Sequence, residues 1–322
     1  MKILITGGAG FIGSHLCRRL LREKHTVICV DNFLTGPRAN IKEFMQNKAF
    51  RLVEHDVIKP LPSGMTAEII FHLASPASPN HHSKLSYHAF PMETMLVNTI
   101  GTLELLKFAE KNRAKFLFAS SSEVYGDPTQ HPQTEEYKGN VSTTGPRSIY
   151  DEAKRFGETI TAYFVRARNV DARIARIFNT YGPGLAEADM RMIVAFIDQA
   201  LRKKPLTVFG DGTQTRSLCY IDDTVEGLIR LMFSPNTKGE VVNIGSQEEH
   251  SVLEYVRAVK KITNSESKIV FSEKLPEDDP MKRRPNIEKA KKILNWKPKI
   301  HLEEGLQIAI KYYKTKLTIQ KK

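Results

Sequence analysis

The sequence predicts an α/β protein with a doubly wound parallel sheet, and three observations carry this prediction. Over the first 125 residues, short β-branched apolar runs alternate with longer helical patterns, as in βαβ units covered on both faces. A glycine-rich loop follows the first apolar run and opens the first helical pattern. The 322 residues are 41% hydrophobic and 26% charged, which is the balance of an ordinary globular chain.

The individual elements follow from hydrophobic periodicity. Apolar runs predict strands over Lys2–Thr6, Thr26–Asp31, Ala49–Asp56, Ile69–Ala74, Lys115–Ser120 and Ala172–Phe178. Helical spacing predicts helices over Ile12–Glu23, Thr99–Asn112, Ser148–Ala167 and Met192–Arg202. Beyond Lys204 the elements are shorter, and Leu275–Pro285 is the clearest loop. Because no clean linker separates two halves, we expect the C-terminal half to interleave with the first.

The net charge indicates an acidic partner. The chain has 48 Lys and Arg against 36 Asp and Glu, a net of +12, which suits a nucleic acid, a membrane surface or a phosphorylated small molecule. Residues 257–322 hold 18 basic and 8 acidic side chains, so most of the excess is C-terminal. No recognisable nucleic-acid motif interleaves aromatic side chains with these charges. We therefore expect no nucleic-acid partner.

Cysteine usage and hydropathy point to a cytoplasmic location. Cys17, Cys29 and Cys219 form no CxxC pair, which indicates reduced thiols rather than a disulfide framework or a zinc site. No run of about 18 apolar residues predicts a membrane span, and the N-terminus has no signal-peptide pattern. We expect no membrane partner.

The loop Thr6–Gly13 has the features of a dinucleotide-binding turn. Gly7 and Gly10 let backbone N–H groups approach a pyrophosphate at the helix N-terminus, and Gly13 permits close helix–sheet packing. Asp31 ends the second strand, 18 residues after Gly13, where it suits a ribose diol. An acid there favours NAD over NADP, because a 2′-phosphate would meet a like charge. These features predict a Rossmann-type domain that binds NAD.

A tyrosine–lysine pair and a serine–glutamate run suggest catalysis. Tyr150 and Lys154 lie one helical turn apart on one face, so the ammonium group would lower the pKa of the phenol toward that of a general base. The fifth predicted strand runs into Ser121, Ser122 and Glu123, at the edge of a doubly wound sheet where catalytic groups gather. Each feature alone is common as a surface pair or a helix cap. Their joint occurrence favours an active site.

Longer stretches carry a resemblance to a known family. They include GGAGFIGSHL from Gly7, DNFLTG from Asp31, HLASPASP from His72, SSEVYGDP from Ser121, YDEAKR from Tyr150, RIFNTYGP from Arg176 and DDPMKRRPNIEKAKKILNWKP from Asp278. Over nearly its whole length the chain resembles extended short-chain dehydrogenase/reductases of the nucleotide-sugar class, and within them the UDP-glucuronate decarboxylases, also called UDP-xylose synthases. Related dehydratases carry an Asp before the Glu, and related 4-epimerases lack the Glu. Ser122-Glu123 therefore favours loss of carbon dioxide.

The resemblance implies NAD-dependent conversion of UDP-glucuronate to UDP-xylose through a UDP-4-keto intermediate. The implied catalytic residues are Tyr150 as the base, Lys154, Ser121, Ser122, Glu123 and Arg216. The implied NAD contacts are Gly7, Gly10, Phe11, Ile12, Gly13, Asp31, Asn32, Thr35, Gly36, Asp56, Val57, Leu73, Ser75, Asn98, Tyr150 and Lys154. The implied nucleotide-sugar contacts are Asn179, Arg191, Arg216, Arg284 and Phe209, the last of them stacked on uracil.

The resemblance also implies a domain division and an assembly. Residues 1–178 with about 215–247 form the NAD-binding domain, residues 179–214 and 248–315 form a smaller interleaved C-terminal substrate-binding lobe, and residues 316–322 form a basic tail. The helices Thr99–Asn112 and Ser148–Ala167 resemble those of the family's dimeric four-helix bundle. We therefore expect a homodimer.

Besides Asn286, which stands where the family has Asp, two places depart from the family pattern. Leu96-Val97 stand where the family has Lys-Thr, which leaves the exact substrate open. The loop Pro79–Phe90 is longer than expected and contains His81, His82 and His88. We predict a solvated lid there and no metal site, because no further cluster of ligand residues supports one.

Two kinds of alternative stay open. One is a related 4,6-dehydratase or 4-epimerase, or a decarboxylase that releases a UDP-4-keto-pentose. The other is a nucleic-acid-binding protein on a retained dehydrogenase fold, which the +12 charge motivates. Retention of Ser121, Tyr150 and Lys154 together argues against the second alternative.

Overall fold

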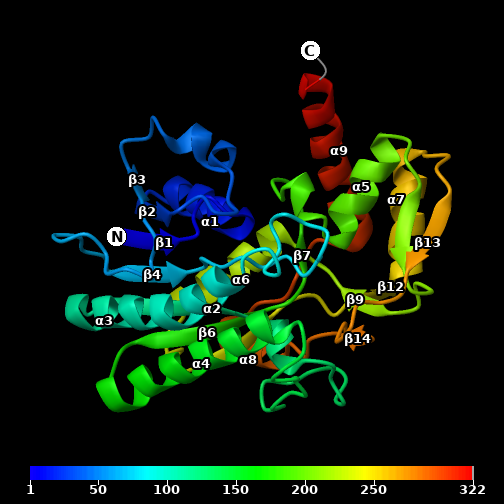
Figure 1. Ribbon diagram of the computed structural model, residues 1–322. Helices are drawn as coiled ribbons and strands as arrows, with labels where there is room; N and C mark the ends of the chain where they lie inside the picture. Colours follow the sequence, from blue (N-terminus) through cyan, green and yellow to red (C-terminus); the bar gives the residue numbers. More distant parts are fainter. Residues whose placement is uncertain (321–322) are drawn as a thin grey trace.

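A seven-stranded parallel sheet forms the larger part of the molecule (Figure 1). The computed structural model describes residues 1–320. The strands lie in the order β11-β6-β5-β4-β1-β2-β3. Their bounds are β1 Lys2–Thr6, β2 Thr26–Asp31, β3 Phe50–Glu54, β4 Ile69–His72, β5 Lys115–Ser121, β6 Ala172–Ile177 and β11 Val241–Ile244. The order reverses between β1 and β4, so the carboxyl ends of these strands open onto a crevice. The predicted doubly wound sheet is confirmed.

Alternation along the strands places apolar side chains on both faces of the sheet. Ile3 and Ile5 of β1 belong to one buried cluster, and Leu4 between them belongs to another. Helices α1 (Phe11–Arg22) and α6 (Ile221–Phe233) pack together in the first cluster, and α3 (Thr102–Asn112) and α4 (Ser148–Arg168) in the second. Because helices cover both faces of the sheet, its strands are continuous apolar runs in the sequence.

The predicted helix over Thr99–Asn112 begins too late. In the structure, α2 (Pro91–Leu96) starts with a proline at its first turn, which is favourable there. It continues through a π-helical turn, η2 (Val97–Gly101), into α3. The sequence pattern did not reveal this continuous helix, because the polar and β-branched residues of η2 interrupt the apolar periodicity.

The C-terminal lobe is built from short sheets and three helices beside the carboxyl edge of the main sheet (Figure 1). Its helices are α5 (Met192–Leu201), α7 (Val252–Thr263) and α9 (Leu302–Gln320), which contact one another. Its strand pairs are β8 (Leu206–Phe209) with β13 (Ile269–Glu273), and β9 (Thr215–Ser217) with β12 (Glu249–Ser251) and β14 (Lys282–Arg283). The remaining elements are η1 (Arg38–Phe44), η3 (Ser122–Tyr125), β7 (Thr180–Tyr181), η4 (Glu187–Asp189), β10 (Cys219–Tyr220) and α8 (Glu288–Leu294).

Several boundaries differ from the sequence-based expectations. The predicted loop Leu275–Pro285 contains β14, a two-residue strand too short to leave a periodic pattern. Residues 316–320 of the predicted basic tail continue helix α9, and residues 321–322 lie outside the described residues. All three cysteines are buried free thiols. Among residues 1–320, no helix combines the length and apolarity that crossing a bilayer requires.

Gly157 sets how closely α4 approaches the sheet. A Cβ at this position would lie 2.3 Å from Phe118 Cζ and 2.8 Å from the Asn98 carbonyl oxygen. We predict that Gly157→Ala lowers the free energy of unfolding by about 1–3 kcal/mol, because the added methyl group overpacks this contact. Urea unfolding measures the change. Gly101→Ala is the matched control, since its Cβ would meet Val57 Cγ2 at an ordinary 3.4 Å. Equal stability of the two variants would contradict the prediction.

Candidate active site

A cavity of about 910 Å³ lies between the carboxyl edge of the sheet and the C-terminal lobe. Its walls include the loops after β1, β2, β4 and β5, together with residues of α4, α5, β8, β9 and β14. This is the position at which open α/β sheets bind ligands. The cavity is large enough for more than one small-molecule moiety.

The glycine-rich loop leaves no room for side chains at the cavity wall. A Cβ on Gly13 would lie 2.1 Å from the Gly7 carbonyl oxygen, and one on Gly7 would lie 2.8 Å from Ala74 Cα. Gly7 also has φ +69°, a conformation that L side chains rarely adopt. Helix α1 begins directly after Gly10, so its free N–H groups face the anion site that the sequence predicts. The loop therefore fits a pyrophosphate.

Asp31 is held in place as a hydrogen-bond acceptor. It is buried at the end of β2, where Oδ2 accepts from the Ala9 N–H at 2.9 Å and Oδ1 from the Phe33 N–H at 2.8 Å. Burial raises the pKa of its carboxyl group, and these two bonds act in the opposite direction. A carboxylate fixed in this way suits a ribose diol.

Most of the other predicted NAD contacts also line the cavity. These are Gly10, Phe11, Ile12, Asn32, Thr35, Gly36, Asp56, Val57, Leu73, Ser75, Tyr150 and Lys154. Asn98 is the exception, because its buried amide donates to the Thr94 carbonyl oxygen at 2.8 Å and to Ser75 Oγ at 2.9 Å. It therefore positions Ser75 instead of lining the cavity.

Tyr150 and Lys154 project from α4 into the cavity. The Tyr150 ring stacks on Tyr87 with centroids 5.1 Å apart, and Lys154 Nζ lies 5.5 Å from its centroid. Burial raises the pKa of Tyr150, and a hydrogen bond with Ser121 lowers it. The sequence-based expectation of a lowered pKa is wrong for this structure, because burial outweighs the other influences.

Lys154 is a buried cation without a close carboxylate. Its Nζ donates to the Ala119 carbonyl oxygen at 2.7 Å. Burial lowers the pKa of the ammonium group from 10.5 to about 7, and the charge of Glu158 opposes this shift. The side chain is therefore ready to change its charge state near neutral pH.

Glu123 lies in a buried network of opposite charges. Its carboxylate accepts from Arg147 Nη2 and Arg283 Nη1. Asp279 continues the network, because Oδ1 accepts from Arg147 Nη1 at 3.1 Å and Oδ2 from Arg216 Nη2 at 2.8 Å. Burial raises the pKa of Glu123, but the two arginines beside it dominate and hold it at about 2. Glu123 is therefore ionised at neutral pH.

Besides Asn98, two residues on the predicted list lie outside the cavity lining. Arg284 Nη1 faces Glu249 at 3.4 Å, whereas Arg283 is buried and lines the cavity. Neighbouring side chains on extended backbone point to opposite sides, so only one arginine of this pair enters the cavity. Ser122 is buried beneath the lining, beside Ser121, which does line the cavity.

The remaining predicted substrate contacts, Asn179, Arg191, Phe209 and Arg216, all line the cavity. The sequence-based interpretation missed Arg147, Arg283 and Asp279. Arg147 directly precedes α4, three residues before Tyr150, and this proximity was an available signal. Asp279 and Arg283 come from the stretch expected to be a loop, so no periodic pattern marked them.

A comparison with protein families decides what kind of protein this is. The model of the NAD dependent epimerase/dehydratase family matches residues 3–245. The chain belongs to this family. The glycine loop and Asp31 fit the cofactor in the family's description, and NAD is accordingly the cofactor of this protein.

Individual members of the NAD dependent epimerase/dehydratase family resemble the chain over nearly its whole length. UDP-glucuronic acid decarboxylase 6 of Arabidopsis thaliana is 46% identical over 323 residues, covering 100% of this chain and 91% of the relative. UDP-glucuronic acid decarboxylase 1 of Danio rerio is 46% identical over 321 residues, covering 99% and 74%. The solved UDP-glucuronic acid 4-epimerase of Bacillus cereus, in complex with UDP-glucuronic acid and NAD, superimposes with TM-score 0.87 at 31% identity, covering 98% of this chain and 99% of the other.

The buried ammonium group of Lys154 predicts a pH-dependent stability. Between pH 7 and 10.5 the unfolded chain keeps this proton and the folded protein loses it, so the free energy of unfolding rises with pH in this window. Lys154→Met removes the contribution. We expect the stability of the wild type relative to the variant to increase from pH 7 to pH 10, measured by urea unfolding at both pH values. A constant difference would contradict the burial of a charged lysine.

Proposed function

We propose that this protein decarboxylates UDP-glucuronate to UDP-xylose through a UDP-4-keto intermediate, with NAD as its resident cofactor. The observation that carries the proposal is Glu123, held ionised between Arg147 and Arg283 in the cavity that also contains Tyr150. Two relatives that are 46% identical over nearly the whole chain are UDP-glucuronic acid decarboxylases.

The cavity has two ends, one for NAD and one for the nucleotide of the substrate. The glycine loop, Asp31 and Lys154 hold NAD, which when bound accepts a hydride from C4 of the sugar and returns it. Asn179, Arg191 and Phe209 lie toward the C-terminal lobe and bind the nucleotide, with the arginine on the diphosphate and the aromatic ring on the uracil. Asp189 holds the Arg191 guanidinium through two bonds of 2.6 and 2.9 Å, so its orientation is fixed before binding.

Tyr150 moves the proton of the sugar 4-hydroxyl. Its ring is clamped on Tyr87, and its hydroxyl shares a hydrogen bond with Ser121. This bond stabilises the phenolate against the effect of burial. Tyr150 takes the proton when C4 becomes a ketone and gives it back when C4 is reduced.

Decarboxylation follows from the position of the ketone. A C4 ketone is β to the C6 carboxylate, so the electron pair of the C5–C6 bond passes into an enolate as carbon dioxide leaves. A proton from solvent then adds to C5 and restores the ketone, which is reduced at C4. Arg216 and the arginines around Glu123 orient the carboxyl-bearing ring. The ionised Glu123 fixes Arg147 and Arg283 in the cavity through its ion pairs with them. Ser122 has no direct part in this step, because it lies beneath the cavity lining.

Product analysis tests the proposal. The purified protein is incubated with UDP-glucuronate and catalytic NAD, and the products are weighed by mass spectrometry. We expect a product lighter than the substrate by one carbon dioxide. A further loss of two hydrogens would indicate release of the UDP-4-keto-pentose, and loss of water or an unchanged mass would contradict the proposal.

Tyr150→Phe should lower kcat by about 10²–10⁴ and retain NAD. The control Tyr163→Phe changes an exposed tyrosine of the same helix and should stay active.

We further propose that the protein is a homodimer. Met92, Ile100, Phe156 and Tyr163 are 56%, 42%, 53% and 51% exposed on the adjoining elements α2, η2 and α4. Exposed large apolar side chains gathered on neighbouring elements are typical of an interface.

All three cysteines are buried free thiols, which supports a reducing, cytoplasmic location.

Phe156→Glu tests the dimer. We expect this variant to be monomeric in light scattering coupled to gel filtration, because a charge in an apolar interface is costly. Phe271→Glu is the matched control, since Phe271 is 57% exposed on β13 in the other lobe. A monomeric wild type, or a Phe156→Glu variant that stays dimeric, would overturn the proposal.

A further inference from the structure

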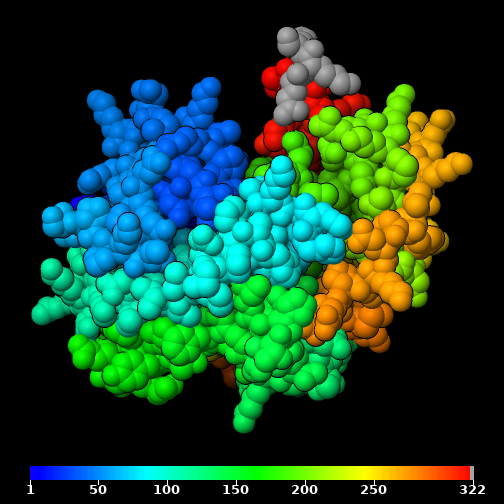
Figure 2. Space-filling view, in the orientation of Figure 1, coloured from blue at the N-terminus to red at the C-terminus, as the bar shows by residue number. Residues whose placement is uncertain are grey.

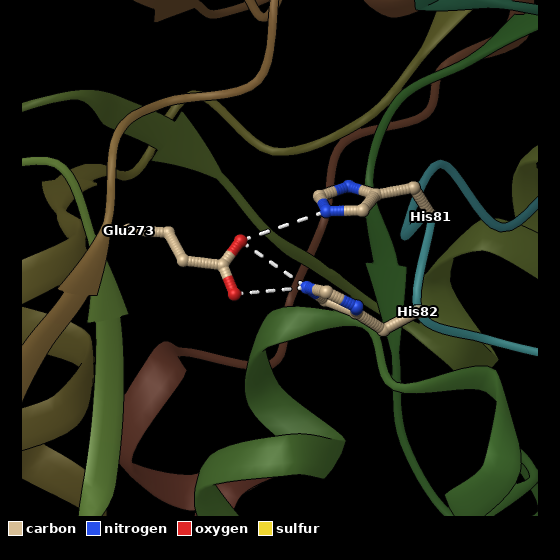
Figure 3. A group of neighbouring side chains, drawn as sticks. All are labelled: His81, His82 and Glu273. Carbon is tan, nitrogen blue, oxygen red and sulfur yellow. Dashed lines mark hydrogen bonds and ion pairs between the residues drawn. The ribbon is translucent and has the colours of Figure 1, made fainter.

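Three side chains of the kinds that bind metal ions meet at the rim of the cavity (Figure 3). His81 and His82 come from the loop after β4, and Glu273 is the last residue of β13. His82 Nε2 lies 3.0 Å from Glu273 Oε1 and 3.2 Å from Oε2, and His81 Nε2 lies 3.6 Å from Oε2. Both rings point toward the carboxylate. All three side chains are between 42% and 47% exposed, so an ion has access to them.

The spacing of these donor atoms matches that of zinc ligands. Zinc binds imidazole nitrogen and carboxylate oxygen at about 2.0–2.2 Å with tetrahedral geometry, which separates the ligand atoms by about 3.3 Å. The nitrogen–oxygen distances of 3.0–3.6 Å already lie around this value. All the ligand atoms lie within 4.8 Å of one another, so small side-chain rotations bring them to the spacing that zinc requires.

The loop that carries the histidines is fixed to the protein beside it. Ser83 Oγ donates to the Ala188 carbonyl oxygen at 2.6 Å, Ser78 Oγ donates to that of Asp189 at 2.7 Å, and Asn80 Nδ2 donates to that of Met190 at 2.9 Å. The Asn80 side-chain oxygen Oδ1 also accepts from the His82 backbone N–H at 2.9 Å. On the other side, β13 pairs with β8 up to Glu273. Both halves of the cluster are thus preorganised, which lowers the cost of binding an ion.

We propose that His81, His82 and Glu273 bind a divalent transition-metal ion of the zinc class. Two imidazoles and one carboxylate favour zinc over magnesium or calcium, which prefer oxygen ligands alone. Three protein ligands leave the fourth position for water or an oxygen of a bound molecule. The sequence-based expectation of no metal site is revised, because that expectation lacked Glu273. His88, the third histidine of the loop, lies against Tyr87 instead.

The position of the site gives the ion a function. The ion would join the loop after β4 to β13 across the cavity rim; the corresponding segments, cyan and orange, adjoin in Figure 2. The His81 ring lies 6.3 Å from that of Phe209 and nearly parallel to it, at the end of the cavity where we place the uracil. We infer that the bound ion slows exchange of the nucleotide, a consequence that rests on the proposed function.

Metal titration tests the site itself. Tag-free protein is treated with a chelator, dialysed and titrated with Zn²⁺ by calorimetry and with Co²⁺ by visible absorption. We expect one ion per chain and the intense absorption of four-coordinate Co²⁺. His82→Gln and Glu273→Gln should each weaken binding by at least about tenfold, since each removes a ligand. His301→Gln is the control, because His301 is 87% exposed and away from the cluster. Absence of saturable binding, or equal affinity in all variants, would overturn the proposal.

Release of UDP tests the functional consequence. Dissociation of a fluorescent UDP analogue is followed by stopped flow with and without one equivalent of Zn²⁺. Release from the wild type should slow when zinc is present, and release from Glu273→Gln should not change. If zinc binds as expected but leaves the release rate unchanged, the site stands and its effect on exchange is overturned. Failure of UDP to bind would contradict the proposed function and leave the metal titration unaffected.

Discussion

The buried charge network around Glu123 is the constraint on which the rest of the cavity depends. Glu123 follows β5 of the main sheet, Arg147 precedes α4, and Arg283 belongs to β14 of the C-terminal lobe. Asp279 and Arg216 extend the same network within the lobe. The network therefore ties together two parts of the fold that share no strand. Removing one member of such a buried pair typically costs about 3–5 kcal/mol, because its partner keeps an uncompensated charge.

This network also decides the electrostatics of the cavity. Arg147 and Arg283 keep Glu123 ionised. Burial, together with the charge of the ionised Glu123, raises the pKa of the neighbouring Asp151 to about 8. Burial and the same negative charge raise the pKa of the Tyr150 phenol, and its hydrogen bond with Ser121 lowers it. Two neighbouring carboxyl groups, 28 positions apart in the sequence, thus differ widely in pKa. Environments of this kind are typical of active sites.

The main sheet and the C-terminal lobe contact each other both deep in the cavity and at its rim, and the two contacts differ in burial. At the inner end the contact is the buried network of arginines and carboxylates. At the rim it is the exposed group of His81, His82 and Glu273, which solvent and ions can reach. The buried network fixes the lobe against the sheet, whereas the exposed group at the rim is open to an ion. Exchange of a molecule bound in the cavity is therefore more readily modulated at the rim than at the buried network.

The sequence by itself determined the local features, because each arises from a few neighbouring residues. The strand–loop–helix of Gly7 to Gly13, the acid at Asp31 and the helical pair Tyr150 and Lys154 are all short-range patterns, and the cavity contains all of them. The doubly wound sheet followed from the alternation of strands and helices, and the structure confirms it.

Only the tertiary structure decided which distant charges meet. Arg283 reaches Glu123 across 160 positions of sequence, and Glu273 reaches His82 across 191. Contacts of this range depend on how the lobe docks on the sheet, which no local pattern encodes. The choice of Arg283 over Arg284 depends on which side of the backbone faces the cavity at the end of β14. The raised pKa of Tyr150 likewise comes from burial, which is a property of the packed molecule and not of the Tyr-Lys spacing.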